Sequence, residues 1–597
     1  MNQEIKQCQN CKKPFTIKPE DFEFYEKIKV PPPTWCPECR FQRRMIWRNE
    51  NIFYKRKCDA TGKDIFSMFS PNAPVKVYDR DYWWSDQWDP MQYGNEYDFS
   101  RPFFEQLKEL IQTVPWPSRS FLNNVRSEYC MNCSNLKECY MLFDADFTEN
   151  SSYGVALNQA RNCFDILSVD FCELCYECFD CVKCYGVLYS SNCEDCNNVV
   201  FCKDCINCTD CFGCVGLRNK SHCIFNMQYS PEEYSKKIAE FDLGSHQSLL
   251  EVKKKAREAF QMFPVRFMHG SHNQNVSGDY VYHSRNVLDS YMVADGEDSR
   301  FCSFIKLPFG PKNCYDYDLF GWNAEKIYEC NNVGYNASNI KFSVLVYIDS
   351  YDVEYSFSCS PSVNNLFGCV GLRNKSYCIL NKQYSKEEYE KLLIKIKEHM
   401  NAMPYRDARG REYAYGEFIP AELCPYAYNE SVVQEYMPLS QVEAVKRGFL
   451  WRDPAVKDYL TTMSWQGLPD HINDVPDSLL KETILCENWD NNQKEAQQHN
   501  CTKAFRITAS ELEFYRNMKL SLPRKCFYCR HRERTLQRSP VLKKWQRQCA
   551  CDNQVYKNSS EHAHHMGERC PNNFQTSYAP DRPEIVYCET CYQTEIV

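Results

Sequence analysis

Four cysteines near the start of the chain have the spacing of a metal site. Cys8 and Cys11 form one Cys-x2-Cys pair, and Cys36 and Cys39 form a second. Two such pairs supply four thiolates, which is the ligand set of a closed tetrahedral zinc site. The spacing therefore predicts a structural zinc ion at these four residues, and it indicates no reaction.

A second copy of this module lies near the other end of the chain. The counterparts of Cys11, Cys36 and Cys39 are Cys501, Cys526 and Cys529. Gln498 stands where the first cysteine should be. Neutral imidazole can complete a three-cysteine site, so the neighbouring His499 is one candidate for the fourth ligand. Cys486, at the far end of a polar insert, is the other, and a vacant fourth position is a third possibility.

A further cluster follows the second module. Five sulfurs are available for one more zinc ion, from Cys549, Cys551, Cys570, Cys588 and Cys591. His562, His564 and His565 lie in the same insert and could compete with them, because imidazole is also a zinc ligand. We therefore expect two to three zinc ions per chain.

The central region contains a ladder of cysteines. Between Cys130 and Cys223 there are 17, and two runs repeat at every third residue. Three interpretations fit this pattern. The cysteines could form an iron–sulfur or multinuclear zinc site, or a redox-active set of thiols. They could also be small inward-facing core residues of a narrow solenoid. A period of three requires frequent corners, as in a coil of triangular section. The second half of the chain keeps only six cysteines in the corresponding region, from Cys302 to Cys378, which favours core filling.

Internal repeats predict the fold. The segment from Cys211 to Tyr234 recurs almost verbatim from Leu366 to Tyr389, and Ser230 and Ser385 are plausible caps of the helices that follow. Related aromatic-glycine phrases recur about every 20–27 residues, a period typical of solenoid coils. We expect a multidomain, mainly β protein, with terminal zinc ribbons flanking two Cys-rich β-solenoid-like repeats, each closed by a helix. Two compact α+β domains produced by duplication are the alternative.

The predicted domains follow from these repeats. They are a zinc ribbon with a basic arm (1–60), an aromatic and proline-rich linker with one helix (61–126), the first solenoid repeat (127–228), a helix and connector (229–284), the second solenoid repeat (285–383), a helix with an acidic proline-rich connector (384–485), and the second ribbon, arm and cysteine cluster (486–597).

The terminal modules also resemble a known family. The pattern C-x2-C-x3-F, then F-Y, then P-x2-C-x2-C-R is similar to the small probable zinc-ribbon domain found in many uncharacterised bacterial proteins. The resemblance covers about 35 residues at each end and implies a structural zinc at Cys8, Cys11, Cys36 and Cys39. Ribbons that bracket Cys-rich repeats look like uncharacterised proteins of reduced-genome bacteria. No activity comes with this resemblance.

Both ribbons run into basic arms with interleaved tryptophans, Trp47 and Trp545. Arginine beside aromatic residues suits phosphate contacts and base stacking, whereas a solvated helix would carry the same charges without a ligand. The candidate nucleic-acid-binding residues are Arg40, Arg43, Arg44, Arg48, Arg530, Arg532, Arg534, Lys543 and Lys544.

Composition limits the function classes. The net charge of −8 argues against a whole-chain polyanion binder. The start of the chain has no apolar leader and the sequence has no apolar run of about 18 residues, so we expect a cytoplasmic protein with reduced cysteines and no membrane association. The sequence has no glycine-rich phosphate loop, H-E-x-x-H or nucleophile elbow, and we expect no enzyme. His269, His272 and His283, near Asp279, are the one cluster that could suggest catalysis.

These observations favour a zinc-binding scaffold that binds macromolecules, with nucleic acid or a nucleoprotein complex as the first-choice partner. One alternative is an iron–sulfur or thiol redox protein that uses the cysteines between 163 and 223. Another is a structural module that binds a protein partner through its repeats.

Overall fold

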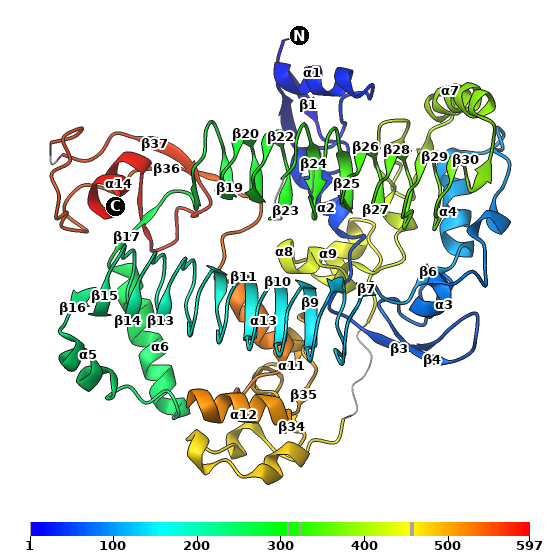
Figure 1. Ribbon diagram of the computed structural model, residues 1–597. Helices are drawn as coiled ribbons and strands as arrows, with labels where there is room; N and C mark the ends of the chain where they lie inside the picture. The colour runs from blue at the N-terminus through cyan, green and yellow to red at the C-terminus, as the bar shows by residue number, and fades with distance from the viewer. Residues whose placement is uncertain (1, 307–309, 322–323, 454–458, 567, 597) are drawn as a thin grey trace. The chain divides into compact units, whose positions relative to one another are not determined.

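The chain folds into two compact units, each built around a β-solenoid. The computed structural model describes residues 2–306, 310–321, 324–453, 459–566 and 568–596 (Figure 1). The N-terminal unit comprises Met1–Arg119, Met268–Arg452 and Pro540–Lys544. The C-terminal unit comprises Ser120–Phe267, Asp453–Ser539 and Trp545–Val597. Each unit therefore combines one terminal cysteine module with one solenoid.

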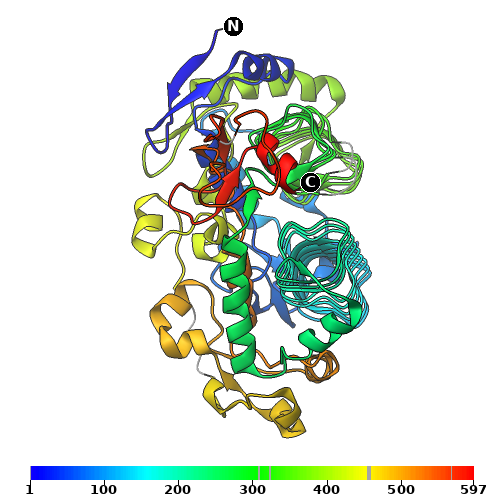
Figure 2. The same ribbon diagram turned by 90° about the vertical axis from the view of Figure 1, so that its left-hand side faces the viewer.

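The first solenoid belongs to the C-terminal unit. Its strands are β7 (Phe121–Leu122), β8 (Cys133–Ser134), β9 (Tyr140–Asp146), β10 (Ser152–Asn158), β11 (Phe164–Asp170), β12 (Phe179–Val182), β13 (Asn197–Val200), β14 (Thr209–Phe212) and β15 (Ser221–Ile224). Neighbouring strands are parallel, and Ser152 pairs with Tyr140 on one side and with Phe164 on the other. One coil is thus twelve residues long, and the predicted period of 20–27 residues is wrong. Figure 2 shows the coils stacked nearly end on.

Each coil turns a corner after every three residues. Left-handed backbone recurs at Asn123, Arg126, Tyr129 and Asn132, with φ between 43° and 54°. Twelve residues therefore make four short sides, so the predicted triangular section is wrong. A left-handed residue with a Cβ costs about 1–2 kcal/mol, and Asn and Asp tolerate this conformation better than most residues. This explains the many Asn and Asp residues at corners of the repeat.

One residue in every three points into the coil, directly after a left-handed corner residue, and in the first solenoid it is most often cysteine. Cys178 is fully buried. Its thiol contacts the carbonyl oxygens of Tyr176, at 3.3 Å, and Val187, at 3.1 Å. Other ladder cysteines repeat these contacts two residues before and nine residues after the sulfur. A small side chain with a weak donor fits this narrow interior, which supports the core-filling interpretation.

The second solenoid belongs to the N-terminal unit. Its strands are β18 (Gly270–Ser271), β19 (Gly278–Tyr282), β20 (Arg285–Leu288), β21 (Ser290–Ala294), β22 (Glu297–Arg300), β23 (Ser303–Ile305), β24 (Tyr315–Asp318), β25 (Tyr328–Gly334), β26 (Ser338–Lys341), β27 (Val344–Tyr347), β28 (Tyr351–Glu354), β29 (Asn364–Phe367) and β30 (Ser376–Ile379). Most coils have twelve or thirteen residues, as in the pairing of Tyr315 with Tyr328. Val, Ile, Leu and Tyr take most inward positions here. The coil therefore does not depend on cysteine, as the second half of the sequence indicated.

A helix closes each solenoid, as expected. The last coils end in the antiparallel strands β16 (Met227–Gln228) and β31 (Lys382–Gln383). The helices α5 (Pro231–Ile238) and α7 (Lys386–Ala402) follow directly, with Ser230 and Ser385 as N-caps. In the C-terminal unit, Leu249 and Val252 of α6 (His246–Gln261) also share a buried apolar cluster with Phe212 of the coils. No helix among the described residues has the length and apolar character needed to cross a membrane.

The terminal modules dock on the solenoids through the same stacked aromatic pair. The first module contains β1 (Glu4–Gln7), β2 (Pro14–Ile17), α1 (Pro19–Lys27) and α2 (Pro37–Met45), and the second contains β34 (Ile484–Leu485), β35 (Ala504–Phe505), α12 (Ala509–Met518) and α13 (Phe527–Thr535). Phe24 stacks on Tyr315, with ring centroids 3.9 Å apart, and Phe514 stacks on Phe164 at 4.3 Å. The duplication therefore includes the contact between module and solenoid as well as the module itself.

The remaining elements connect these parts. In the N-terminal unit they are β3 (Tyr54–Lys57), β4 (Asp64–Ser67), β5 (Val77–Tyr78), α3 (Arg80–Trp84), η1 (Pro90–Tyr93), α4 (Phe103–Thr113), β6 (Trp116–Pro117), β32 (Tyr405–Arg406), β33 (Glu412–Tyr413), η2 (Ala421–Leu423), η3 (Tyr428–Glu430), α8 (Val433–Tyr436) and α9 (Gln441–Lys446). In the C-terminal unit they are β17 (Pro264–Arg266), η4 (Trp465–Gly467), η5 (Ile472–Asp474), η6 (Asp477–Lys481), α10 (Glu487–Asn491), α11 (Gln493–Gln498), β36 (Trp545–Gln548), β37 (Asn573–Thr576), β38 (Ile585–Tyr587) and α14 (Glu589–Ile596).

Candidate metal centres

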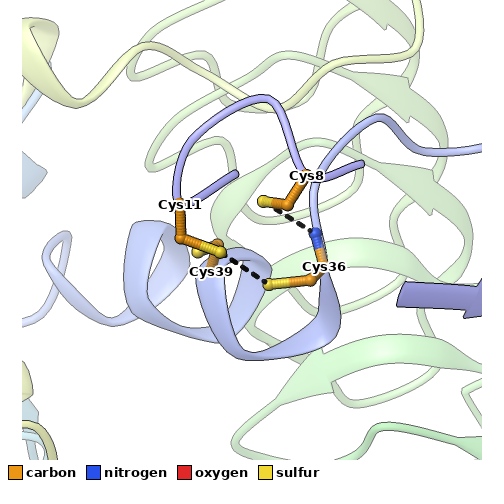
Figure 3. A group of neighbouring side chains, drawn as sticks. All are labelled: Cys8, Cys11, Cys36 and Cys39. Carbon is orange, nitrogen blue, oxygen red and sulfur yellow. Dashed lines mark hydrogen bonds between the residues drawn. The ribbon is translucent and has the colours of Figure 1, made fainter. Parts of the chain in front are cut away.

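The first module brings its four cysteines into one group. The β1–β2 hairpin holds Cys8 and Cys11, and the start of α2 holds Cys36 and Cys39 (Figure 3). The ligand atoms of all four lie within 4.8 Å of one another, and the sulfurs of Cys11 and Cys36 are 3.7 Å apart. Zinc–sulfur bonds of about 2.3 Å in a tetrahedron place two sulfurs about 3.8 Å apart. The group therefore has the dimensions of a four-thiolate metal site.

Hydrogen bonds stabilise thiolates in this group. The amide of Cys36 donates to the sulfur of Cys8 over 3.2 Å, and Asn10 Nδ2 donates to the sulfur of Cys39 over 3.3 Å. Cys36 is the N-cap of α2. The positive end of the helix dipole therefore lies beside the sulfurs. Hydrogen bonds from Cys36 and Cys39 lower the pKa of Cys8 well below its usual range, whereas hydrogen bonds with Cys36 and Cys8 raise the pKa of Cys39. Deprotonated sulfur is the form that binds metal.

In the second module, Cys486 completes the group and His499 does not. The buried group consists of Cys486, Cys501, Cys526 and Cys529. Its sulfur–sulfur distances are 3.8 Å for Cys486–Cys529 and 3.7 Å for Cys501–Cys526. Pairing of β34 with β35 brings the end of one strand beside the start of the other, and this places Cys486 at the site. His499 follows α11, a helix of the insert, and lies outside the group.

The C-terminal cluster contains a third four-cysteine group. Its members are Cys549, Cys570, Cys588 and Cys591, which are buried and mutually close. The sulfurs of Cys570 and Cys588 are 3.9 Å apart, and the amide of Cys588 donates to the sulfur of Cys549 over 3.2 Å. The fifth sulfur expected here, that of Cys551, lies with His562 and His565 instead.

The corresponding place in the first half has no such group among the described residues. Cys58 follows β3 as Cys549 follows β36, and the amide of Asp79 donates to the Cys58 sulfur over 3.1 Å. Asp79 thus occupies the place of Cys588. Cys58 is accordingly isolated from the candidate ligand groups of the described chain.

The arginines of the first basic arm are buried against the second solenoid. Arg40, Arg43 and Arg44 are at most 2% exposed. Arg40 Nε donates to Asp316 over 2.9 Å, and Arg44 Nε donates to Asp318 over 2.6 Å. Arg43 forms ion pairs with Glu329 and Glu417, and Arg48 with Glu50.

The second arm repeats this arrangement on the first solenoid. Arg530 and Arg534 donate to Oδ1 of Asp165 over 2.9 and 3.2 Å, and Arg538 pairs with Asp180 at 2.7 Å. Arg532 is partly exposed beside Glu495, Lys544 pairs with Asp289, and Lys543 is exposed. Most of the candidate nucleic-acid contacts are therefore neutralised by carboxylates within the protein, and the arrangement gives no support to nucleic-acid binding at these positions.

The histidine cluster between the repeats is part of the second solenoid. His269 Nδ1 lies 3.0 Å from Asp279, and His272 stacks on His283 with ring centroids 4.8 Å apart. In the described part of the chain these histidines belong to no group of metal ligands.

Comparison with known proteins adds no family. No family model matches the chain, and no curated protein matches it. Among solved structures, it is similar to a protein described as an acetyltransferase from Desulfovibrio desulfuricans G20. The two are 11% identical, the match covers 49% of this chain and 86% of that one, and the TM-score is 0.09. A likeness this weak does not establish a common fold. The structure itself defines the class: a β-solenoid protein with Cys-rich candidate metal centres.

Proposed function

We propose that this protein is a zinc-stabilised scaffold that binds a macromolecular partner through its solenoids. The observation that carries the proposal is the repeated link between metal group and solenoid. In each ribbon, the helix that begins at the third cysteine of the group also carries the arginines that pair with solenoid carboxylates. A metal ion that fixes the start of this helix fixes its arginines as well.

The donor sets favour a structural role for the metal. Four cysteines per ribbon fill a tetrahedron, and an ion with four protein ligands keeps no position for a substrate. Thiolate-only sites are typical of structural zinc. The N-terminal ribbon would be held by Cys8, Cys11, Cys36 and Cys39, and the second ribbon by Cys486, Cys501, Cys526 and Cys529.

The proposed partner is a protein. Phe147, Phe171 and Tyr185 of the first solenoid are 59%, 49% and 47% exposed. Phe147 and Phe171 have the same left-handed corner conformation two coils apart, which places them about 10 Å from each other along the stack. Aromatic side chains at this spacing on a rigid surface suit contact with another protein.

The test combines metal analysis with nucleic-acid titration of the full chain. Zinc should be present, and Cys11→Ser and Cys501→Ser should each remove one ion. Duplex DNA and single-stranded RNA should show no binding that weakens steeply with salt. Brown, iron-containing protein would overturn the proposal in favour of the redox alternative. Strongly salt-dependent binding would overturn it in favour of a nucleic-acid partner.

A further inference from the structure

The C-terminal cluster contains more ligands than one tetrahedral ion can use. Its eight side chains are Cys549, Cys551, His562, His564, His565, Cys570, Cys588 and Cys591. Cys591 belongs to the four-cysteine group and also to a second buried group with Cys551, His562 and His565. We infer that this cluster holds two metal ions that share the Cys591 thiolate. The inference rests on the proposed function only in taking this module as metal-binding.

The second group has tetrahedral dimensions. The sulfur of Cys551 lies 3.6 Å from His562 Nδ1 and 3.4 Å from His565 Nε2. The sulfur of Cys591 lies 3.7 Å from the same His565 nitrogen. With a zinc–sulfur bond of about 2.3 Å and a zinc–nitrogen bond of about 2.0 Å, a tetrahedral ion places sulfur and nitrogen about 3.5 Å apart. A soft sulfur and imidazole donor set of this kind suits zinc.

Side chains around the second group hold its ligands in place. Glu595 Oε2 lies 3.3 Å from His562 Nε2, and both side chains are almost fully buried. The amide of Ser560 donates to the same carboxylate oxygen over 3.2 Å, which fixes it. Metal-binding histidines commonly place their second nitrogen against a carboxylate in this way. On the other side of the site, Asn558 Nδ2 donates to the Cys551 sulfur over 3.2 Å.

The insert that carries these ligands has no hydrophobic core of its own. Between 551 and 570, the buried residues among those described are Cys551, His562, His565 and Cys570. All four are candidate ligands. Ordering a polar loop costs conformational entropy, and burial of four polar or ionisable side chains does not offset that cost by itself. Metal binding supplies the missing stabilisation.

The first half of the chain provides an internal control. There, the amide of Cys58 donates to the carbonyl of Lys63, which closes a short turn between β3 and β4. In the C-terminal module, Cys549 makes the same contact with Asn572, and the long insert lies between the two. The hairpin therefore forms without the insert, and the additional candidate ligands lie within the insert.

Two tetrahedral ions need eight ligand positions, and seven side chains fill them when one thiolate is shared. Cys549, Cys570 and Cys588 complete the first ion, and Cys551, His562 and His565 complete the second, with Cys591 common to both. The eighth side chain is His564, which is exposed and lies 3.2 Å from the Cys591 sulfur. It is the matched control, because it is a neighbouring histidine outside both sets.

The test is metal analysis of the full chain by mass spectrometry, with the ribbons contributing two ions. We expect four ions per chain in the unaltered protein, three in His562→Ala, and four in His564→Ala. Three ions in the unaltered protein, with no loss in His562→Ala, would overturn the inference. A loss in His564→Ala would assign the site to the alternative group of His564, His565, Cys570 and Cys591, and would also overturn it.

A second measurement needs no substitution and so does not depend on a variant that folds. In the cadmium-113 form, the Cys591 β-protons should couple to two distinct cadmium signals. Coupling to a single signal would refute the shared thiolate. Failure of the proposed function is a separate outcome, because it would appear as metal-free ribbons that do not respond to Cys11→Ser or Cys501→Ser.

Discussion

Replacing Asp165 with Asn should loosen the second ribbon from the first solenoid. Asp165 is fully buried and accepts hydrogen bonds from both Arg530 and Arg534. Asn keeps the shape and still suits the left-handed backbone, whose φ is 57°. The substitution removes the negative charge and leaves two buried guanidinium groups uncompensated.

The magnitude follows from the burial of this ion pair. Removing one partner of a buried pair costs about 3–5 kcal/mol. Helix α13 carries both arginines, so its amides should report the loss by hydrogen exchange. Since each 1.4 kcal/mol is a factor of ten, exchange of these amides should accelerate about 10²- to 10⁴-fold. The metal content should not change, because no candidate ligand is altered.

Asp195→Asn is the matched control for this prediction. Asp195 has the same left-handed backbone, with φ of 51°, and is exposed on the same solenoid. Its substitution should change stability by less than about 0.5 kcal/mol. Equal exchange of the α13 amides in the two variants would refute the reasoning that buried ion pairs fasten the ribbon.

The other predictions concern the second metal group, a buried carboxyl and the ladder. Cys486→Ser should remove one metal ion, whereas His499→Ala should remove none; the reverse result in metal analysis would contradict the assignment. Burial raises the pKa of Glu511 to about 7, from 4.5, against the lowering effect of Arg530. The folded state then holds a proton that the unfolded chain releases, so this contribution is present below pH 4.5 and is lost as pH rises through 7. The stability difference between the unaltered protein and Glu511→Gln should fall by about 3 kcal/mol across that range in urea titrations, and a constant difference would reject the shift. Cys178→Ala should cost about 1 kcal/mol in thermal unfolding without loss of metal, whereas a lost ion would identify the ladder as a metal site.

The first candidate metal group could be predicted from the sequence because each of its two cysteine pairs is local. Both Cys-x2-Cys pairs place two sulfurs on one turn of chain, so spacing alone indicates the site. The choice of Cys486 over His499 as the fourth candidate ligand could not be made in this way. The position of Cys486 depends on pairing of β34 with β35 across the insert, and the sequence alone does not reveal that pairing.

The fold class could also be predicted, but the coil length could not. The aromatic-glycine phrases recur every 20–27 residues, which is near the length of two twelve-residue coils and does not reveal the length of one. The period of three correctly indicates corners, but the number of sides per coil is set by the hydrogen-bond register between strands.

The basic arms were misleading for a related reason. The carboxylates that neutralise them, such as Asp165 and Asp316, lie hundreds of residues away in the chain.

The four-sided coil has a consequence for how the chain finds its register. A slip of three residues rotates a coil by one side and still turns the same class of residue inward. The pattern of buried and exposed residues therefore does not distinguish the native register from registers shifted by three residues. In an ordinary strand it does, because a one-residue slip exposes the core side chains. The carboxylates do distinguish them. Asp165 and Asp180 meet the arginines of one ribbon helix and its extension only in one rotational setting. The ribbon thus stabilises one register of the coil over several alternative registers that would bury a similar surface.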